Sequence, residues 1–279
     1  MGDVMINAKT KVLAVIGKPI VHSKSPLIHN TGLIKNKIDA VYLAFEVTDV
    51  KRSIDAMREL GFLGYSVTIP HKVEAMKYVD DISESAKKIG AINTIVNKNG
   101  KLFGHNTDCD GFIAALKEKT IVKGKKVHLI GAGGAARAIA AGLTQEGAKV
   151  KIFDIDEAKA AALAKDFNCE SGKLDKVDGN CDVLVNATPA GMHPNTETMS
   201  VPKSILKKGT IVFDIVYNPL ETMLIKEAKK AGCTTIIGVE MFLGQAFAQF
   251  EMFTGEKAPK KEMRKALLTE LKKEAAVKK

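Results

Sequence analysis

The 279-residue sequence has no long apolar run, few cysteines and no tryptophan. The first two shortages argue against a membrane-spanning protein and a disulfide-rich protein, and the third bears on nucleic-acid binding. Without a run of about 18 apolar residues, a membrane-spanning helix is not expected. The N-terminus lacks the apolar segment of a signal peptide, so we expect a cytoplasmic protein without a membrane partner. Cys109, Cys169, Cys181 and Cys233 form no C-x-x-C pair and have no neighbouring histidine set, which argues against a metal site and a disulfide framework.

Arginine is also scarce, although the formal net charge is +10. It is limited to Arg52, Arg58, Arg137 and Arg264, whereas nucleic-acid recognition usually relies on arginine and aromatic side chains. Lysines are spread along the chain and become dense only at 257–279. We therefore expect a solvated basic surface that attracts an anionic substrate and cofactor, and no nucleic-acid partner.

The most informative motif that is present is a strand that turns on glycines into an alanine-rich helix, KVHLIGAGGAARAIAA at 126–141. Gly131, Gly133 and Ala136 fit the G-x-G-x-x-G/A pattern, in which the backbone approaches a pyrophosphate at the helix N-terminus. The next strand ends at Asp154, about 20 residues beyond the last glycine, where a carboxylate can bind a ribose hydroxyl. This motif predicts a dinucleotide site; the alternative is a close helix–strand crossing without a ligand.

Strands and helices alternate on both sides of this motif, which predicts an α/β protein with parallel sheets and right-handed crossovers. Before it we expect strands at 11–17, 42–47, 64–69, 91–97 and 102–104, and helices at 26–35, 50–60, 70–78, 82–90 and 111–119. After it we expect strands at 150–153, 181–186, 211–215 and 234–237, and helices at 157–167, 220–231, 238–253 and in the lysine-rich tail. The last two helices are expected to pack on the first domain. We therefore expect a Rossmann-type domain at 111–238 and a discontinuous substrate domain at 1–110 plus 239–279.

Several polar residues stand beside predicted strands and helices. Ser23 and Ser25 follow the first strand, where two hydroxyls suit a polyol or carboxylate ligand, although Ser25 before Pro26 is also an ordinary helix start. Asn93, in a predicted buried strand, must bond either to neighbouring backbone or to a ligand. Asp108 precedes a helix, where a cap is the commoner role. These residues alone leave the substrate open.

Together the segments resemble the shikimate dehydrogenases, including the quinate/shikimate relatives. The resemblance covers Gly17 to Gly255 and rests on GKPIVHSKSPLIHN, SVTIPHK, GAINT, NTD, GAGGAARA, NATPAGM, DIVYNPLET and QAFAQFEMFTG. It implies a substrate cleft between a substrate domain with a mainly parallel sheet and a Rossmann-type domain. It also implies reversible hydride transfer between 3-dehydroshikimate and a nicotinamide cofactor, NAD or NADP.

The resemblance also implies the site residues. The catalytic pair falls on Lys72 and Asp108. The substrate ligands fall on Ser23, Ser25, Thr68, Asn93, Tyr217 and Gln245. The cofactor residues are Gly131, Ala132, Gly133, Gly134 and Ala135 in the phosphate turn, Asp154 at the ribose, and Ile215 and Gly238 beside the nicotinamide. Ser66 stands where many members have Asn, and we expect it to support the loop rather than to contact substrate.

The other departure from the family concerns the cofactor. Asp154-Ile155-Asp156 occupies the place where members that use NADP have Asn-Arg-Thr, whose arginine binds the 2′-phosphate. A carboxylate there can accept hydrogen bonds from a ribose diol, but like charges about 4 Å apart repel by about 4 kcal/mol at an effective dielectric of about 20. We therefore expect NAD to be preferred over NADP.

Hydride transfer from a secondary alcohol requires a group that takes the hydroxyl proton. Burial would favour the neutral amine of Lys72, whereas a nearby Asp108 carboxylate would favour the ammonium, so we expect the pair to titrate as a unit. The alternatives are quinate oxidation as the main activity, and a dinucleotide-binding regulator without chemistry. A monomer and a homodimer are both compatible with the sequence.

Overall fold

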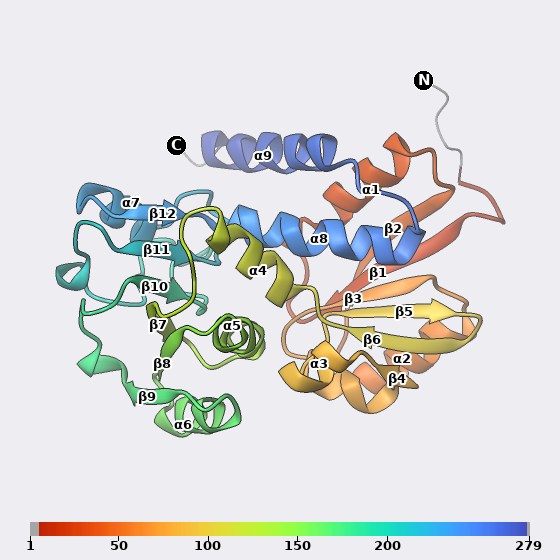
Figure 1. Cartoon of the computed structure of the whole chain (residues 1–279). Coiled ribbons are helices and arrows are strands. Elements are labelled where there is room, and N and C mark those ends of the chain that lie inside the picture. The colour runs from red at the N-terminus through yellow and green to blue at the C-terminus, as the bar shows by residue number, and fades with distance from the viewer. Residues whose placement is uncertain (1–5, 278–279) are drawn as a thin grey trace. The chain divides into compact units, whose positions relative to one another are not determined.

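The structure, a computed structural model, describes residues 6–277, and the chain folds into two compact units (Figure 1). The N-terminal unit comprises the chain up to Thr107 together with Gln245–Lys273. The glycine-rich unit comprises Asp108–Gly244 and the chain from Glu274 onward. Helices α8 (Gly238–Thr254) and α9 (Lys260–Val277) contain residues of both units. The expected domain limits near 110 and 238 stay a prediction, since the second boundary between the units falls inside α8.

The N-terminal unit is built on a mixed six-stranded sheet with the order β2-β1-β3-β5-β6-β4 (Figure 1). Strand β1 pairs in parallel with β2 and β3, and β4 in parallel with β6, whereas β5 is antiparallel to both neighbours. The strands are β1 (Lys11–Gly17), β2 (Ala40–Glu46), β3 (Gly64–Val67), β4 (Asp81–Ile82), β5 (Thr94–Lys98) and β6 (Lys101–His105). The helices before α8 are α1 (Ser25–Lys35), α2 (Val50–Glu59), the 3-10 helix η1 (Glu74–Tyr78) and α3 (Glu84–Ile89).

Local sequence explains these elements. Asp49 caps α2 by accepting the Arg52 N–H, and the helix buries Val50, Ile54 and Met57, which recur on one face. Asn99 and Gly100 have φ of 54° and 86°, the left-handed pair that closes a two-residue hairpin between β5 and β6. At the outer edge of the sheet, the Asn30 side chain of α1 accepts the Tyr42 N–H and donates to the Tyr42 carbonyl, both at 2.8 Å.

Two expectations for this unit are wrong in detail. Residues 70–73 form turns, and only Glu74–Tyr78 is helical, as a 3-10 helix rather than an α-helix. The strand expected from Ala91 starts at Thr94, because the Ile92 N–H bonds to the Lys72 carbonyl and the Asn93 N–H to the His105 carbonyl. Lys72 therefore lies in a turn held against the chain that leads into β5.

The glycine-rich unit contains a six-stranded, fully parallel sheet with the order β12-β11-β10-β7-β8-β9. Read from β9, this is the doubly wound order in which strand order reverses beside the first strand, here β7. The strands are β7 (Lys126–Ile130), β8 (Lys149–Asp154), β9 (Glu170–Lys173), β10 (Val183–Asn186), β11 (Ile211–Asp214) and β12 (Thr234–Ile236). The helices are α4 (Asp108–Lys117), α5 (Gly134–Gln145), α6 (Glu157–Asp166), α7 (Met223–Lys230), and the 3-10 helices η2 (Leu174–Lys176) and η3 (Lys203–Ile205).

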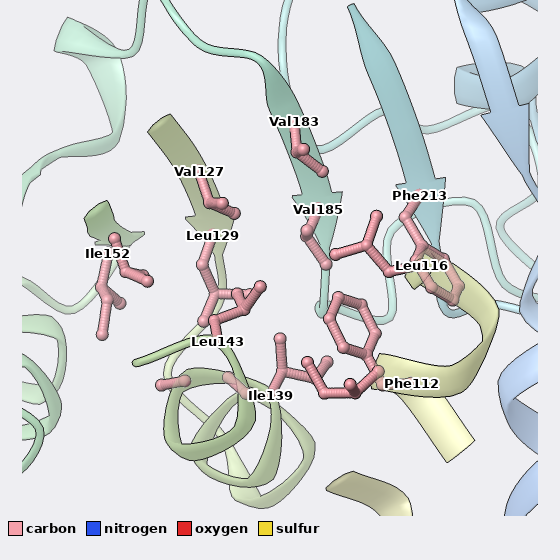
Figure 2. Packing of buried hydrophobic residues seen from close by; sticks show 14 of the residues in the cluster. Phe112, Leu116, Val127, Leu129, Ile139, Leu143, Ile152, Val183, Val185 and Phe213 are labelled. Carbon is pink, nitrogen blue, oxygen red and sulfur yellow. The ribbon is translucent and has the colours of Figure 1, made fainter. Parts of the chain in front are cut away.

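Helices α4 and α5 pack on one face of this sheet around a fully apolar core (Figure 2). Phe112 of α4 stacks on Phe213 of β11, with ring centroids 4.6 Å apart. Ile139 and Leu143 of α5 are completely buried. This packing fixes the start of α5 at the carboxyl end of β7. Within residues 6–277, no helix combines the length and the apolar character that crossing a bilayer requires.

Candidate active site

In the N-terminal unit, predicted site residues meet at the carboxyl ends of β1 and β3. The Thr68 N–H bonds to the Ile16 carbonyl, and a side chain at Gly17 would lie 2.4 Å from the Thr68 methyl, so Thr68 covers the end of β1. Beside it, the Val67 N–H bonds to the Asn93 carbonyl at 2.8 Å. The structure thus brings Thr68, Asn93 and the backbone of Lys72 together at one edge of the sheet.

The amide of Asn93 is buried and fixed in orientation. Its Oδ1 accepts the Thr107 backbone N–H at 2.9 Å and the Thr94 hydroxyl at 2.7 Å, and its Nδ2 donates to Thr107 Oγ1 at 2.9 Å. A backbone N–H can only donate, so the atom that faces it must be the amide oxygen. The amide therefore bonds to neighbouring backbone and hydroxyl groups, and its role as a substrate ligand stays a prediction.

Ser23 and Ser25 lie at the start of α1. Ser25 is the first helical residue and is buried, and its N–H bonds to Ser23 Oγ at 3.3 Å. The N-cap position, Lys24, provides no side-chain cap. The Ser25 N–H is thus used and Pro26 has none, so the two hydroxyls, rather than the backbone of the helix end, are the groups that suit a carboxylate or a polyol.

Helix α8 carries Gln245 and, one turn later, Gln249, both buried. Gln249 accepts the Ser66 hydroxyl at 2.7 Å and donates to the Asn93 carbonyl and to Thr94 Oγ1, both at 3.0 Å. Sequence reasoning gave Gln249 no role. Its partners are more than 150 residues away in the chain, and no local pattern indicates such contacts.

In the glycine-rich unit, the phosphate turn has the geometry that the motif requires. Gly131 has φ of 110°, and a side chain there would lie 2.8 Å from the Ala187 carbonyl oxygen. At Gly133 a Cβ would meet no atom within 4 Å, so this part of the backbone is open. Helix α5 has no side-chain cap and no acidic residue in its first turn. Its terminal N–H groups therefore suit a pyrophosphate.

Asp154 lies at the carboxyl end of β8, and both of its oxygens accept backbone N–H groups. Oδ2 accepts the Ala132 N–H at 2.7 Å, and Oδ1 accepts the Asp156 N–H at 2.9 Å. Asp154 thus holds the glycine-rich turn, while each carboxylate oxygen keeps capacity for a further donor. Beside it lies a surface hollow of ≈ 440 Å³, whose charged lining residues are Asp154, Glu157, Asp175 and Lys173.

The residues expected beside the nicotinamide follow β11. A side chain at Gly238 would lie 2.4 Å from the Ile215 carbonyl oxygen, so only glycine fits this contact. Tyr217 stacks on Phe242 with ring centroids 4.2 Å apart. These contacts fix the segment 215–217 over the start of α8.

Asp214, which ends β11, is a completely buried carboxylate that sequence reasoning missed. It accepts the Thr222 hydroxyl at 2.6 Å, the Asn186 amide at 2.9 Å and the Val216 N–H at 3.0 Å. Burial raises the pKa of Asp214 to about 6, although these hydrogen bonds act in the opposite direction. The available signal was an acid at the end of an apolar strand, the same signal that identified Asp154.

Lys72 and Asp108 fall in different units. Lys72 is half-buried in its turn, and Asp108 is the buried first residue of α4. The meeting of their side chains stays a prediction, as does the binding of one substrate by residues of both units.

Three family models match the chain. One described as shikimate dehydrogenase substrate binding domain covers residues 15–95, and one described as shikimate / quinate 5-dehydrogenase covers residues 114–222. One described as shikimate 5'-dehydrogenase C-terminal domain covers residues 238–268.

Individual relatives agree with these models. A shikimate dehydrogenase (NADP(+)) of Methanocaldococcus jannaschii is 41% identical, over 96% of this chain and 99% of its own. A shikimate 5-dehydrogenase of Listeria monocytogenes, solved with shikimate and NAD, has a TM-score of 0.84 and 35% identity, over 94% of this chain and 98% of its own. A quinate dehydrogenase of Corynebacterium glutamicum, solved with NAD, has a TM-score of 0.87 and 32% identity, over 93% of this chain and 99% of its own. The chain belongs to the shikimate dehydrogenase family.

Proposed function

We propose that this protein catalyses the reversible, nicotinamide-dependent reduction of 3-dehydroshikimate to shikimate. The observation that carries the proposal is that Thr68, Asn93 and the backbone of Lys72 lie together at the carboxyl ends of β1 and β3, in a chain of the shikimate dehydrogenase family. Hydroxyl, amide and ammonium groups are the ones that a small hydroxylated carboxylic acid requires.

The substrate is proposed to bind through Ser23, Ser25, Thr68, Asn93, Tyr217 and Gln245. Lys72 and Asp108 are proposed to act as one proton-exchanging unit at the reacting oxygen, with Lys72 donating the proton when the ketone is reduced. The residues 131–135 and the open start of α5 fit a dinucleotide pyrophosphate. The bound nicotinamide supplies the hydride chemistry, and the protein supplies position and charge control.

The test is a steady-state assay of the purified protein with shikimate and quinate, each with NAD and NADP. We expect the highest kcat/KM with shikimate. Quinate dehydrogenase activity is the second candidate, since a quinate dehydrogenase is among the relatives. A higher kcat/KM with quinate would favour it, and cofactor binding without turnover of either substrate would favour a regulator.

For the cofactor we propose a preference for NAD. Its support is the charge around Asp154: the neighbouring hollow has three carboxylates, and its Lys173 pairs with Glu157 at 3.1 Å. Asp175 pairs with Lys176 at 3.8 Å, so the carboxylate that a 2′-phosphate would face there is Asp154. The NADP(+) named for the Methanocaldococcus jannaschii relative does not support this preference, so a direct measurement is needed.

The variant Asp154→Asn tests this reasoning, because it removes the charge but keeps an oxygen for the Ala132 N–H. We expect the ratio of kcat/KM with NADP to that with NAD to rise by about tenfold or more. The control is Asp175→Asn, a change of the same kind elsewhere in the hollow. A wild-type protein that prefers NADP, or an unchanged ratio in Asp154→Asn, would contradict the proposed role of Asp154.

A further inference from the structure

A continuous chain of buried hydrogen bonds runs through the N-terminal unit. The Tyr42 hydroxyl donates to Ser66 Oγ at 2.6 Å, and Ser66 donates to Gln249 Oε1 at 2.7 Å. Gln249 Nε2 donates to Thr94 Oγ1, and Thr94 donates to Asn93 Oδ1. Each hydroxyl accepts one bond and donates the next, so every member has a defined orientation.

Two backbone groups fix the direction of this chain. The Asn93 carbonyl can only accept, so the Gln249 atom facing it at 3.0 Å must be the amide nitrogen. The Thr107 N–H can only donate, so the Asn93 atom facing it must be the amide oxygen. Gln249 lies between these two anchors and cannot turn its amide over without losing several bonds.

The chain reaches residues with proposed substrate roles at both ends. Asn93 lies at one end, and at the other the Ser25 side chain lies close to the Tyr42 hydroxyl. Gln249 further belongs to the same helical face as Gln245, because the two residues are one turn apart on α8. A displacement of Gln249 would therefore move more than one of the proposed substrate ligands.

We propose that Gln249 is a positioning residue for substrate binding. Its amide holds the Asn93–Thr94 segment, and with it the Asn93 side chain, in the orientation that receives a substrate hydroxyl. The same contact fixes the register of α8 that carries Gln245. The inference rests on the proposed function, since it assigns Asn93 and Gln245 to substrate.

Ser66 provides a way to test this by rescue. Ser66 pairs directly with Thr94 in the antiparallel β3–β5 ladder, so their side chains point to the same face. An asparagine at position 66 can extend its amide toward Thr94 and the Asn93 carbonyl when Gln249 is shortened. The chain thus offers a second position from which an amide can hold the same segment.

The experiment compares wild type, Gln249→Ala, Gln249→Met and the double variant Ser66→Asn with Gln249→Ala, using shikimate as the probe. In Gln249→Ala we expect KM for shikimate to rise about tenfold, with kcat within about threefold and KM for the dinucleotide unchanged. In the double variant we expect KM for shikimate to return to within about threefold of wild type. Gln249→Met keeps the volume without the amide and provides the measurement if the alanine variant is too unstable.

Asn97→Leu is the matched control. It removes a half-buried amide from the other end of β5, where Asn97 bonds to the Phe62 carbonyl and accepts the Gly100 N–H. We expect it to lower the melting temperature without changing KM for shikimate. Gln249 variants that behave like Asn97→Leu, or a double variant without recovery, would overturn the inference. Failure of the proposed function is distinct, because wild type itself would then not oxidise shikimate.

Discussion

At the scale of single residues, the environment of His29 disfavours the protonated form of its ring. His29 is completely buried and stacks on Tyr42, with ring centroids 4.3 Å apart and an interplanar angle of 5°. Neither ring nitrogen has a hydrogen-bond partner. Burial lowers the pKa of His29 to about 3, and the nearby Gln249 side chain opposes this shift only weakly. The histidine is therefore neutral in the folded protein throughout the physiological range.

This environment makes stability depend on pH. Between pH 6.5 and pH 3, His29 is protonated in the unfolded state but not in the folded state. The free energy of unfolding therefore falls as pH decreases from 6.5 toward 3. The loss is about 1.4 kcal/mol per pH unit, or about 2 kcal/mol at pH 5. Urea unfolding at pH 7 and pH 5 should show that His29→Leu lacks this loss. Equal losses in both proteins would contradict the assignment.

Lys72 is the residue on which the proposed chemistry depends. Lys72→Met removes the proton donor but keeps the aliphatic stem, so we expect kcat to fall by at least about 100-fold, with a smaller change in KM for shikimate. Lys77→Met, an exposed lysine in the following 3-10 helix, is the control and should leave both constants unchanged. A variant in which only KM changes would limit Lys72 to binding.

At the scale of elements, the glycine-rich turn separates a structural glycine from a functional one. Gly131 has left-handed φ and a carbonyl 2.8 Å from the place of a Cβ, whereas Gly133 has φ of −84° and open space. Gly131→Ala should lower the melting temperature. Gly133→Ala should fold normally but raise KM for the dinucleotide by about tenfold, because its methyl occupies the face offered to the pyrophosphate. Equal melting temperatures for the two variants would contradict this division.

The helices and strands differ in how far the sequence could predict them. Strands such as β7 and helices such as α2 carry their own apolar period, so their existence and approximate limits were predictable. The strand β9 was missed, because Glu170–Lys173 is polar and is strand only through pairing with β8. The contact between Ser66 and Gln249 joins residues 183 positions apart, and no local pattern contains it. Long-range polar contacts of this kind are fixed by tertiary packing.

At the scale of the whole molecule, the net charge of +10 bears on substrate capture. A positive potential raises the encounter rate of an anionic substrate, and salt screens it. We expect kcat/KM for shikimate to fall about two- to fivefold between about 20 mM and 500 mM salt, with a smaller effect on kcat. Initial-rate assays over this range of salt would measure the change in kcat/KM. The control is the inhibition constant of a neutral dead-end inhibitor, which the potential of the protein should not affect. A rise with salt would contradict the prediction.

The side chain of Asn30 has a consequence for the molecule as a whole. Its amide occupies the N–H and the carbonyl of Tyr42 on the free side of β2, in the way that a neighbouring strand would. A foreign strand that arrived at this residue would find its hydrogen-bonding groups already used. The Asn30 amide thus blocks the pairing of a further strand with β2 at Tyr42.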